Sequence, residues 1–486
     1  MIPEHLKFGG GASETVLHPA VLVAMILTVI LLFVLPRKYR VVPLLSTCFL
    51  VPLGQQVLVG GVHLHVLRIL ILAGCVRMMT EKRGRWDQLD KLFATWAVCR
   101  SIAFVLLFRD SGAVVNQAAF LLDALGGFFL LRYLIQDQED IQRTVKTLAV
   151  VAAVLAVCML NERYNSRNVF GYLGGVRLVP EVRDGSIRAQ GPFAHALLAG
   201  SFGATLLPLF AWLWSNRGAR LVAGAGIMAS AIITLTSASS TPMMAFAAGI
   251  FGMCLWVMRD YLSILRWGCV AVIAVLAVAM KAPVWFLIAR IDLIGGSSGY
   301  HRALLIDQFI RHFFDWWLVG TNSNSTWGWD MWDTCNQYVT EGETGGLVTF
   351  VCFIALIWIS FVRFGKARRA VRGDRKSEWF YWILGTTLFA HTVAFLGIVY
   401  FDQTRMIWYA FLAIGIAATA PVLAARATPV RIEDAEATGN EAALASPRWA
   451  PATENPRLSP VDTHSRFSTI LPVKAGLGRT SPTLNS

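Results

Sequence analysis

The sequence predicts an all-α membrane protein, a transmembrane bundle of about 12–14 helices with two long extracytoplasmic loops. Of its 486 residues, 56% are hydrophobic and only 15% are charged. Apolar runs repeatedly reach the roughly 20 residues that cross about 30 Å of hydrocarbon. The net charge of +13 comes mostly from short loops beside these runs, which indicates orientation in a membrane and not nucleic-acid binding.

Three groups of apolar runs are expected to form spans. The first group lies within residues 1–160, with runs at about 16–35, 41–59, 62–77, 92–108, 113–135 and 147–160 and a turn at Gly60 and Gly61. The second lies within 194–288, with runs at about 194–214, 221–236, 242–258 and 267–288. The third lies within 345–425, with runs at about 345–362, 380–399 and 406–425.

Clusters of Lys and Arg predict how the chain is oriented in the membrane. They follow the first, third and eleventh runs, at residues 37–40, 82–91 and 363–376. Because Lys and Arg concentrate in cytoplasmic loops, these clusters place the N-terminal arm outside and the C-terminus inside. Residues 426–486 are rich in Ala, Pro, Ser, Thr and Arg, so this cytoplasmic tail is predicted to be disordered.

The polar segment 161–193 is rich in arginine although alternation of the spans places it outside, where short loops normally contain few Lys and Arg residues. It carries five arginines against three acidic residues, namely Arg163, Arg167, Arg177, Arg183 and Arg188 against Glu162, Glu181 and Asp184. Guanidinium groups present paired donors that match phosphate oxygens and keep their charge. We therefore expect an anionic ligand here, with Arg188 and Arg183 as the first candidates and lipid-headgroup contact as the alternative.

The second outside segment, 289–344, is rich in aromatic and polar side chains. The aromatic residues are Trp316, Trp317, Trp327, Trp329, Trp332 and Tyr338, and they alternate with Asn and Asp. Such a set suits a carbohydrate-binding surface, although Trp and Tyr also gather at membrane interfaces without a ligand. A helix is expected to begin near Tyr300, with Arg302 directed towards the arginine-rich loop.

Short motifs in both loops resemble those of the O-antigen ligase and O-antigen polymerase superfamily. The first loop ends in Arg188-Ala-Gln-Gly-Pro-Phe-Ala-His195 and runs into a span. The second contains Tyr300-His301-Arg302, Trp317-Leu-Val-Gly320, Asn336-Gln-Tyr338, Glu341 and Gly345-Gly-Leu347. The resemblance covers about residues 161–362.

This resemblance implies a metal-independent glycosyltransferase in the bacterial inner membrane, active on its outer face, in O-antigen or exopolysaccharide assembly. Its donor would be a polyprenyl-pyrophosphate-linked oligosaccharide and its acceptor a glycan or lipid-linked glycan. Arginines from the two loops would converge over one cavity and stabilise the departing diphosphate. The expected catalytic residues are Arg188, Arg302 and Glu341, and the expected substrate-binding residues are Arg183, His195, His301, Trp317, Asn336 and Tyr338.

One residue departs from the ligase pattern. Ligases of this superfamily have a histidine just before Asn336, and this chain has Cys335. The sequence shows no cause for an activated thiol, so the base role would pass to Glu341, Glu343, Asp333 or His301. The substitution favours a polymerase over a ligase.

Two other classes of protein stay open. A transporter or flippase is one, although the chain shows no internal repeat and its polar residues concentrate in the two outside loops, which favours chemistry at the surface. Arg68, Arg100, Arg132 and Asp123 lie within or near spans, where charge is costly and is often functional or paired. A non-catalytic scaffold for polysaccharide export is the other. No cofactor, metal or nucleic-acid partner is expected, because His63 and His65 lack a second pair of ligands and no nucleotide-binding motif occurs.

Overall fold

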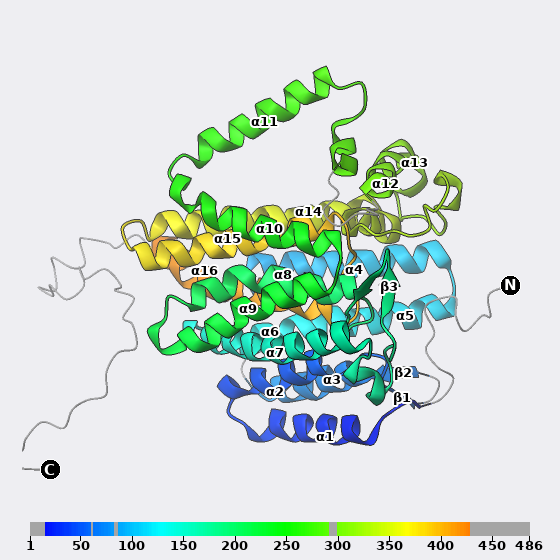
Figure 1. Ribbon diagram of the computed structural model, residues 1–486, viewed down its shortest axis with the longest axis vertical. Coiled ribbons are helices and arrows are strands. Elements are labelled where there is room, and N and C mark those ends of the chain that lie inside the picture. The colour runs from blue at the N-terminus through cyan, green and yellow to red at the C-terminus, as the bar shows by residue number, and fades with distance from the viewer. Residues whose placement is uncertain (1–14, 60–61, 82–85, 291–298, 428–486) are drawn as a thin grey trace, which may run out of the picture. The chain divides into compact units, whose positions relative to one another are not determined.

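The computed structural model describes residues 15–59, 62–81, 86–290 and 299–427, and these form a helical bundle (Figure 1). Nine helices or helix pairs of the described ranges are long and apolar enough to cross a membrane, so the chain is a multi-pass membrane protein. The expected turn at Gly60 and Gly61, the basic residues 82–85, the N-terminal arm and nearly all of the tail 426–486 lie outside the described ranges.

The N-terminal part differs from the predicted pattern. Helices α1 (Pro19–Val34), α2 (Arg37–Leu50) and α3 (Val66–Met79) are separated by a hairpin of β1 (Gln56–Val59) and β2 (Val62–His65), which pair antiparallel with Gln56 opposite His65. The predicted span at 41–59 is therefore wrong in its second half. Residues 56–59 are Gln-Val-Leu-Val, a β-prone run, and β2 gives them a pairing partner that a hydropathy count ignores.

Four helices continue the bundle. They are α4 (Gln88–Phe108), α5 (Ser111–Leu121), α6 (Gly127–Leu134) and α7 (Gln138–Asn165). A π-helical turn, η2 (Leu122–Gly126), joins α5 to α6 without a break. Such turns occur often at functional sites, and this one carries Asp123.

The arginine-rich loop is ordered by short elements. A 3₁₀ helix, η3 (Val169–Leu173), is followed by β3 (Glu181–Arg183) and β4 (Ser186–Arg188), which pair antiparallel with Glu181 opposite Arg188. The chain then enters α8 (Ala196–Leu213), η4 (Arg217–Ala219), α9 (Arg220–Thr236), α10 (Ser240–Cys254) and η5 (Leu255–Met258). Helix α8 is apolar on all sides and almost wholly buried, which places it at the centre of the bundle.

The second loop folds around a core of its own. After α11 (Leu262–Ala279) and η6 (Val284–Arg290) come α12 (Gly299–Arg311), α13 (Phe313–Trp316) and η7 (Ser325–Trp327). The helix expected near Tyr300 is thus present. A small cluster separate from the main core is formed by Leu305, Phe309, Trp316, Trp327, Met331 and Val339.

Three helices complete the bundle, namely α14 (Gln337–Ala370), α15 (Arg375–Phe395) and α16 (Thr404–Ala427). Helix α14 begins eight residues before the predicted span, because Asn336 caps it by accepting from the N–H groups of Tyr338 and Val339. Gly346 interrupts it with a φ of 69°. Figure 1 shows α12 and α13 at the same end of the bundle as β3.

Candidate functional site: an arginine cluster at the start of α10

Arg188 and Arg302 meet at the first residues of α10. Arg188 ends β4, and its Nη2 donates to Ser239 Oγ at 2.8 Å. Arg302 lies near the start of α12, and its Nη1 is 3.5 Å from Ser240 Oγ. The two loops therefore bring one guanidinium each to consecutive serines. We call Arg188, Arg302, Ser239 and Ser240 the arginine cluster.

Both guanidinium groups are buried and incompletely bonded. Arg188 is 6% exposed and Arg302 is 5% exposed. The Nε atom of each is buried and has no acceptor among the described residues. Arg188 also pairs through Nη1 with Glu181 at 3.0 Å, and this carboxylate is 41% exposed. Burial lowers the pKa of Arg302, and the charge of Arg183 acts in the same direction.

The start of α10 adds to the positive potential. Ser239 is the N-cap residue, but its hydroxyl donates to the Ser237 carbonyl oxygen at 2.8 Å and makes no cap bond. The positive end of the α10 dipole therefore points to the same place as the two guanidinium groups. Buried cations with unused donors at a helix N-terminus form a site for an anion.

The segment after Arg188 is held rigidly at the ends of α7 and α9. The Glu162 carboxylate accepts from the N–H groups of Gln190 at 3.1 Å and Gly191 at 2.9 Å. The N–H of Ala189 donates to the Thr236 carbonyl oxygen at 3.0 Å. These bonds fix the backbone next to Arg188, so its guanidinium is preorganised.

Two further predicted residues lie beside the cluster. Arg183 is on the β3–β4 hairpin, half exposed and 3.7 Å from Asp184. His301 precedes Arg302, with Nε2 2.9 Å from the Asp330 carbonyl oxygen.

Two of the predicted substrate-binding residues, Asn336 and Tyr338, use their polar groups in hydrogen bonds within the protein. Both ends of the Asn336 amide are used, since Nδ2 donates to the Leu396 carbonyl oxygen at 3.2 Å while Oδ1 caps α14. The Tyr338 hydroxyl donates to the Thr392 carbonyl oxygen at 3.0 Å. Trp317 is 42% exposed, whereas its neighbour Trp316 stacks on Phe309 in the small core. The structure thus gives Asn336 and Tyr338 roles in joining α14 to α15.

Glu341 is not among the residues that contact the cluster. It is fully buried in α14, where its carboxylate accepts from Trp96 Nε1 at 2.8 Å and Gln337 Nε2 at 2.6 Å. Arg100 Nε lies 4.0 Å away. These donors already occupy the carboxylate, so the expected catalytic role of Glu341 has no support from its contacts.

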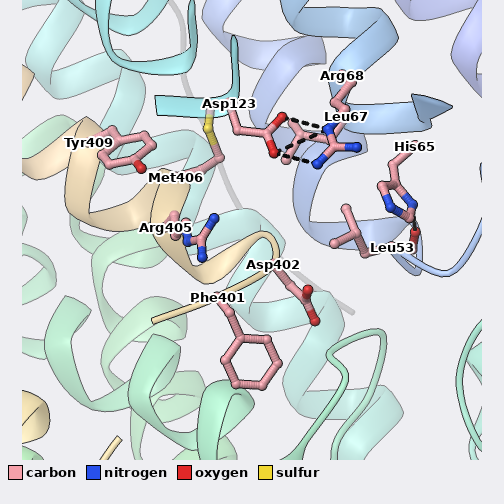
Figure 2. Close-up of a pocket in the computed structure, with 10 residues that line it drawn as sticks. All are labelled: Leu53, His65, Leu67, Arg68, Asp123, Phe401, Asp402, Arg405, Met406 and Tyr409. Atoms are coloured by element: carbon pink, nitrogen blue, oxygen red, sulfur yellow. Dashed lines mark hydrogen bonds and ion pairs between the residues drawn. The ribbon is translucent and has the colours of Figure 1, made fainter. Parts of the chain in front are cut away.

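A second polar space lies beside the cluster, a cavity of about 140 Å³ (Figure 2). Its lining consists of Leu53, His65, Leu67, Arg68, Asp123, Phe401, Asp402, Arg405, Met406 and Tyr409. Arg68 donates Nε and Nη2 to the Asp123 carboxylate at 2.9–3.2 Å. Figure 2 shows the Asp402 carboxyl apart from this pair.

The turn that carries Asp402 touches the segment that follows Arg188. Gln403 Nε2 donates to the Pro192 carbonyl oxygen at 3.2 Å, and the His195 ring lies against Phe401 at a centroid distance of 5.9 Å. Asp402 has a φ of 52°, which side-chain-bearing residues rarely adopt outside functional or turn positions. The cavity and the arginine cluster are therefore connected through one short stretch of chain.

Sequence reasoning missed the serines of the cluster and the turn that carries Asp402. Ser239 and Ser240 lie in the short interval between the predicted spans 221–236 and 242–258, and Asp402 lies between the predicted spans 380–399 and 406–425. The available signal was an acidic and a basic residue, Asp402 and Arg405, on the outside between two long apolar runs.

Asp402 makes the stability of the protein depend on pH. Burial raises its pKa to about 6, against the opposing effect of the Arg405 charge. Folding therefore favours the protonated carboxyl, and this contribution is lost as the pH rises through 6. We expect Asp402→Asn to raise the thermal unfolding temperature in detergent at pH 7.5. The difference should disappear near pH 4, about the pKa of a free aspartate, and a variant that is less stable at pH 7.5 would show that the contact with Arg405 dominates.

No protein-family model matches the chain, and no curated protein matches it either. The functional interpretation consequently rests on the residues of the site.

Proposed function

We propose that this chain is a membrane glycosyltransferase that acts on a polyprenyl-pyrophosphate-linked oligosaccharide, as the resemblance to the O-antigen ligase and polymerase superfamily implies. One observation carries the proposal, namely the meeting of two buried arginines from separate loops, each with an unused Nε donor, at the N-terminus of α10. A diphosphate supplies the negative charge and the oxygen acceptors that this cluster lacks.

The proposed chemistry follows from where charge develops. An acceptor hydroxyl attacks the anomeric carbon, the bond from that carbon to the diphosphate oxygen breaks, and negative charge accumulates on the leaving oxygen. Arg188 and Arg302 donate to the diphosphate and stabilise this charge more in the transition state than in the ground state. Because Glu162 fixes the backbone beside Arg188, little reorganisation is needed at that moment.

We place the arginine cluster on the outer face of the bacterial inner membrane. Helix α7 carries Asp140, which pairs with Arg37 at 2.7 Å, near its start, and Glu162, beside the cluster, near its end. Its 28 residues span about 42 Å, so the basic residues near Arg37 lie at the opposite end of the bundle. The positive-inside rule then puts Arg37 and the tail in the cytoplasm, with about 12–14 spans in all and the loops 161–193 and 289–344 outside.

Reconstitution tests the proposal directly. Purified protein in proteoliposomes, given a polyprenyl-pyrophosphate-linked oligosaccharide, should yield longer or acceptor-linked glycans and free polyprenyl diphosphate. A polymerase, which the residue Cys335 favours, needs only the lipid-linked donor, whereas a ligase also needs a separate lipid acceptor. Donor that stays intact in the presence of both acceptor types would overturn the proposal.

The cavity lined by Arg68, Asp123, Asp402 and Arg405 favours a second candidate, movement of a lipid-linked glycan or an ion across the membrane. The same proteoliposomes distinguish the two functions. A flippase moves intact donor from one leaflet to the other, which a leaflet-specific lectin detects, and releases no diphosphate.

A further inference from the structure

Cys335 and His301 form a pair at the edge of the arginine cluster. The Cys335 Sγ lies 3.7 Å from His301 Nδ1, and His301 Nε2 lies 2.9 Å from the Asp330 carbonyl oxygen. A carbonyl oxygen only accepts, so Nε2 carries a hydrogen in this contact. Nδ1 consequently presents its lone pair to the thiol. This arrangement of thiol, imidazole and orienting carbonyl is that of an activated cysteine.

Arg302 brings the pair into the site. It interacts with Cys335 as well as with Ser240, so the thiol lies between an imidazole and a buried guanidinium. The hydrogen bond to Cys335 raises the pKa of His301 to about 9, more than burial lowers it. The structure thus places an imidazole and a guanidinium beside the thiol, two neighbours that the sequence alone does not show.

Of the carboxylates that could compete for the role of base, Asp333 is exposed, whereas the two buried ones are already bonded. Glu343 accepts from Asn324 Nδ2 at 2.8 Å and from Thr334 Oγ1 at 2.8 Å. Glu341 accepts from Trp96 and Gln337 inside the bundle. Neither carboxylate is among the groups that act on the charge of Arg302, whereas Cys335 is.

We propose that Cys335 and His301 act as one unit that removes the proton from the acceptor hydroxyl. This inference rests on the proposed glycosyl transfer. In the reaction, the Cys335 thiol proton passes to His301 Nδ1, which faces it. As the acceptor oxygen bonds to the anomeric carbon and the bond to the diphosphate breaks, the acceptor proton passes to the Cys335 thiolate. One proton then leaves the pair for solvent and restores the starting state.

The pair explains the departure from the ligase pattern. The histidine that ligases have just before Asn336 is replaced by Cys335, and an imidazole reaches the same place from α12. A proton-accepting group is therefore kept, built from two side chains.

Thiol reactivity tests the pair without reference to activity. Alkylation of Cys335 by iodoacetamide at pH 7, followed by mass spectrometry of the peptide that contains Cys335, should be at least about fivefold slower in His301→Gln than in the unmodified protein. His312→Gln is the matched control, because His312 bonds to Gln308 and stacks on Trp327. Equal rates in the unmodified protein and His301→Gln would overturn the pair, whether or not the protein transfers sugar.

Glycan-transfer assays test whether the Cys335–His301 pair acts as the base. Cys335→Ser should reduce glycan transfer by about 100-fold or more, and Cys335→His should restore most of that loss, because imidazole is an effective base. Full transfer by Cys335→Ser would overturn the base role and leave the proposed function intact. A glycosyl adduct on Cys335 would also overturn it, since the thiol would then be the nucleophile. If the unmodified protein shows no transfer, the proposed function fails, and alkylation still reports on the pair.

Discussion

Replacing Arg188 by alanine should lower glycan transfer from a polyprenyl-pyrophosphate donor by about 100- to 1,000-fold, and Arg302→Ala should do the same. The measurement is the initial rate of diphosphate release in proteoliposomes. Each variant should keep its thermal unfolding temperature within a few degrees, because each removes a buried cation whose donors are incompletely used.

The expected size of the effect comes from the position of the two side chains. A donor directed at a developing charge contributes most where water is excluded, and both arginines are buried. Arg188→Lys should recover only part of the rate, since an ammonium group keeps the charge but lacks the planar pair of donors.

Arg177→Ala is the matched control, because Arg177 belongs to the same loop and is exposed. It should transfer glycan at the rate of the unmodified protein. If Arg188→Ala and Arg177→Ala behave alike, the arginine cluster is not the diphosphate site, and the five arginines of the loop serve as headgroup contacts.

Much of the fold could be predicted from the sequence, because long apolar runs follow directly from the thickness of the membrane. The nine candidate spans of the described residues agree with this. The hairpin at 56–65 could not be predicted, since its strands are stabilised by pairing with each other and with Val16. The early start of α14 depends on the Asn336 cap, which apolar counting does not detect.

The site was predictable in part. The sequence indicated that Arg188 and Arg302 lie together, because alternation of the spans puts both loops on one side. It could not show that Ser239 and Ser240 receive them, or that His301 reaches Cys335, because these contacts join residues far apart in the chain. For Glu341, the motif suggested a catalytic role, but it could not show that Trp96 and Gln337 donate to its carboxylate.

Glu341→Ala should destabilise the protein by about 3 kcal/mol, as judged by unfolding in detergent, because it leaves the Trp96 indole N–H without its acceptor and Arg100 without its ion-pair partner inside the bundle. Glu341→Gln keeps one oxygen and should cost about 1 kcal/mol. Glu378→Gln is a control at the far end of the bundle, where this glutamate accepts from the Gly373 N–H at 2.7 Å.

The transfer rate of folded Glu341→Gln separates a structural glutamate from a catalytic one. A glutamate that only holds Trp96 and Gln337 in place should allow transfer within about tenfold of the unmodified protein, whereas loss of a general base lowers the rate by about 100-fold or more. If folded Glu341→Gln loses about 100-fold or more of the transfer rate, Glu341 is the base, and Cys335 and His301 do not have that role. Because the Glu341 carboxylate already accepts two hydrogen bonds, we expect the smaller effect.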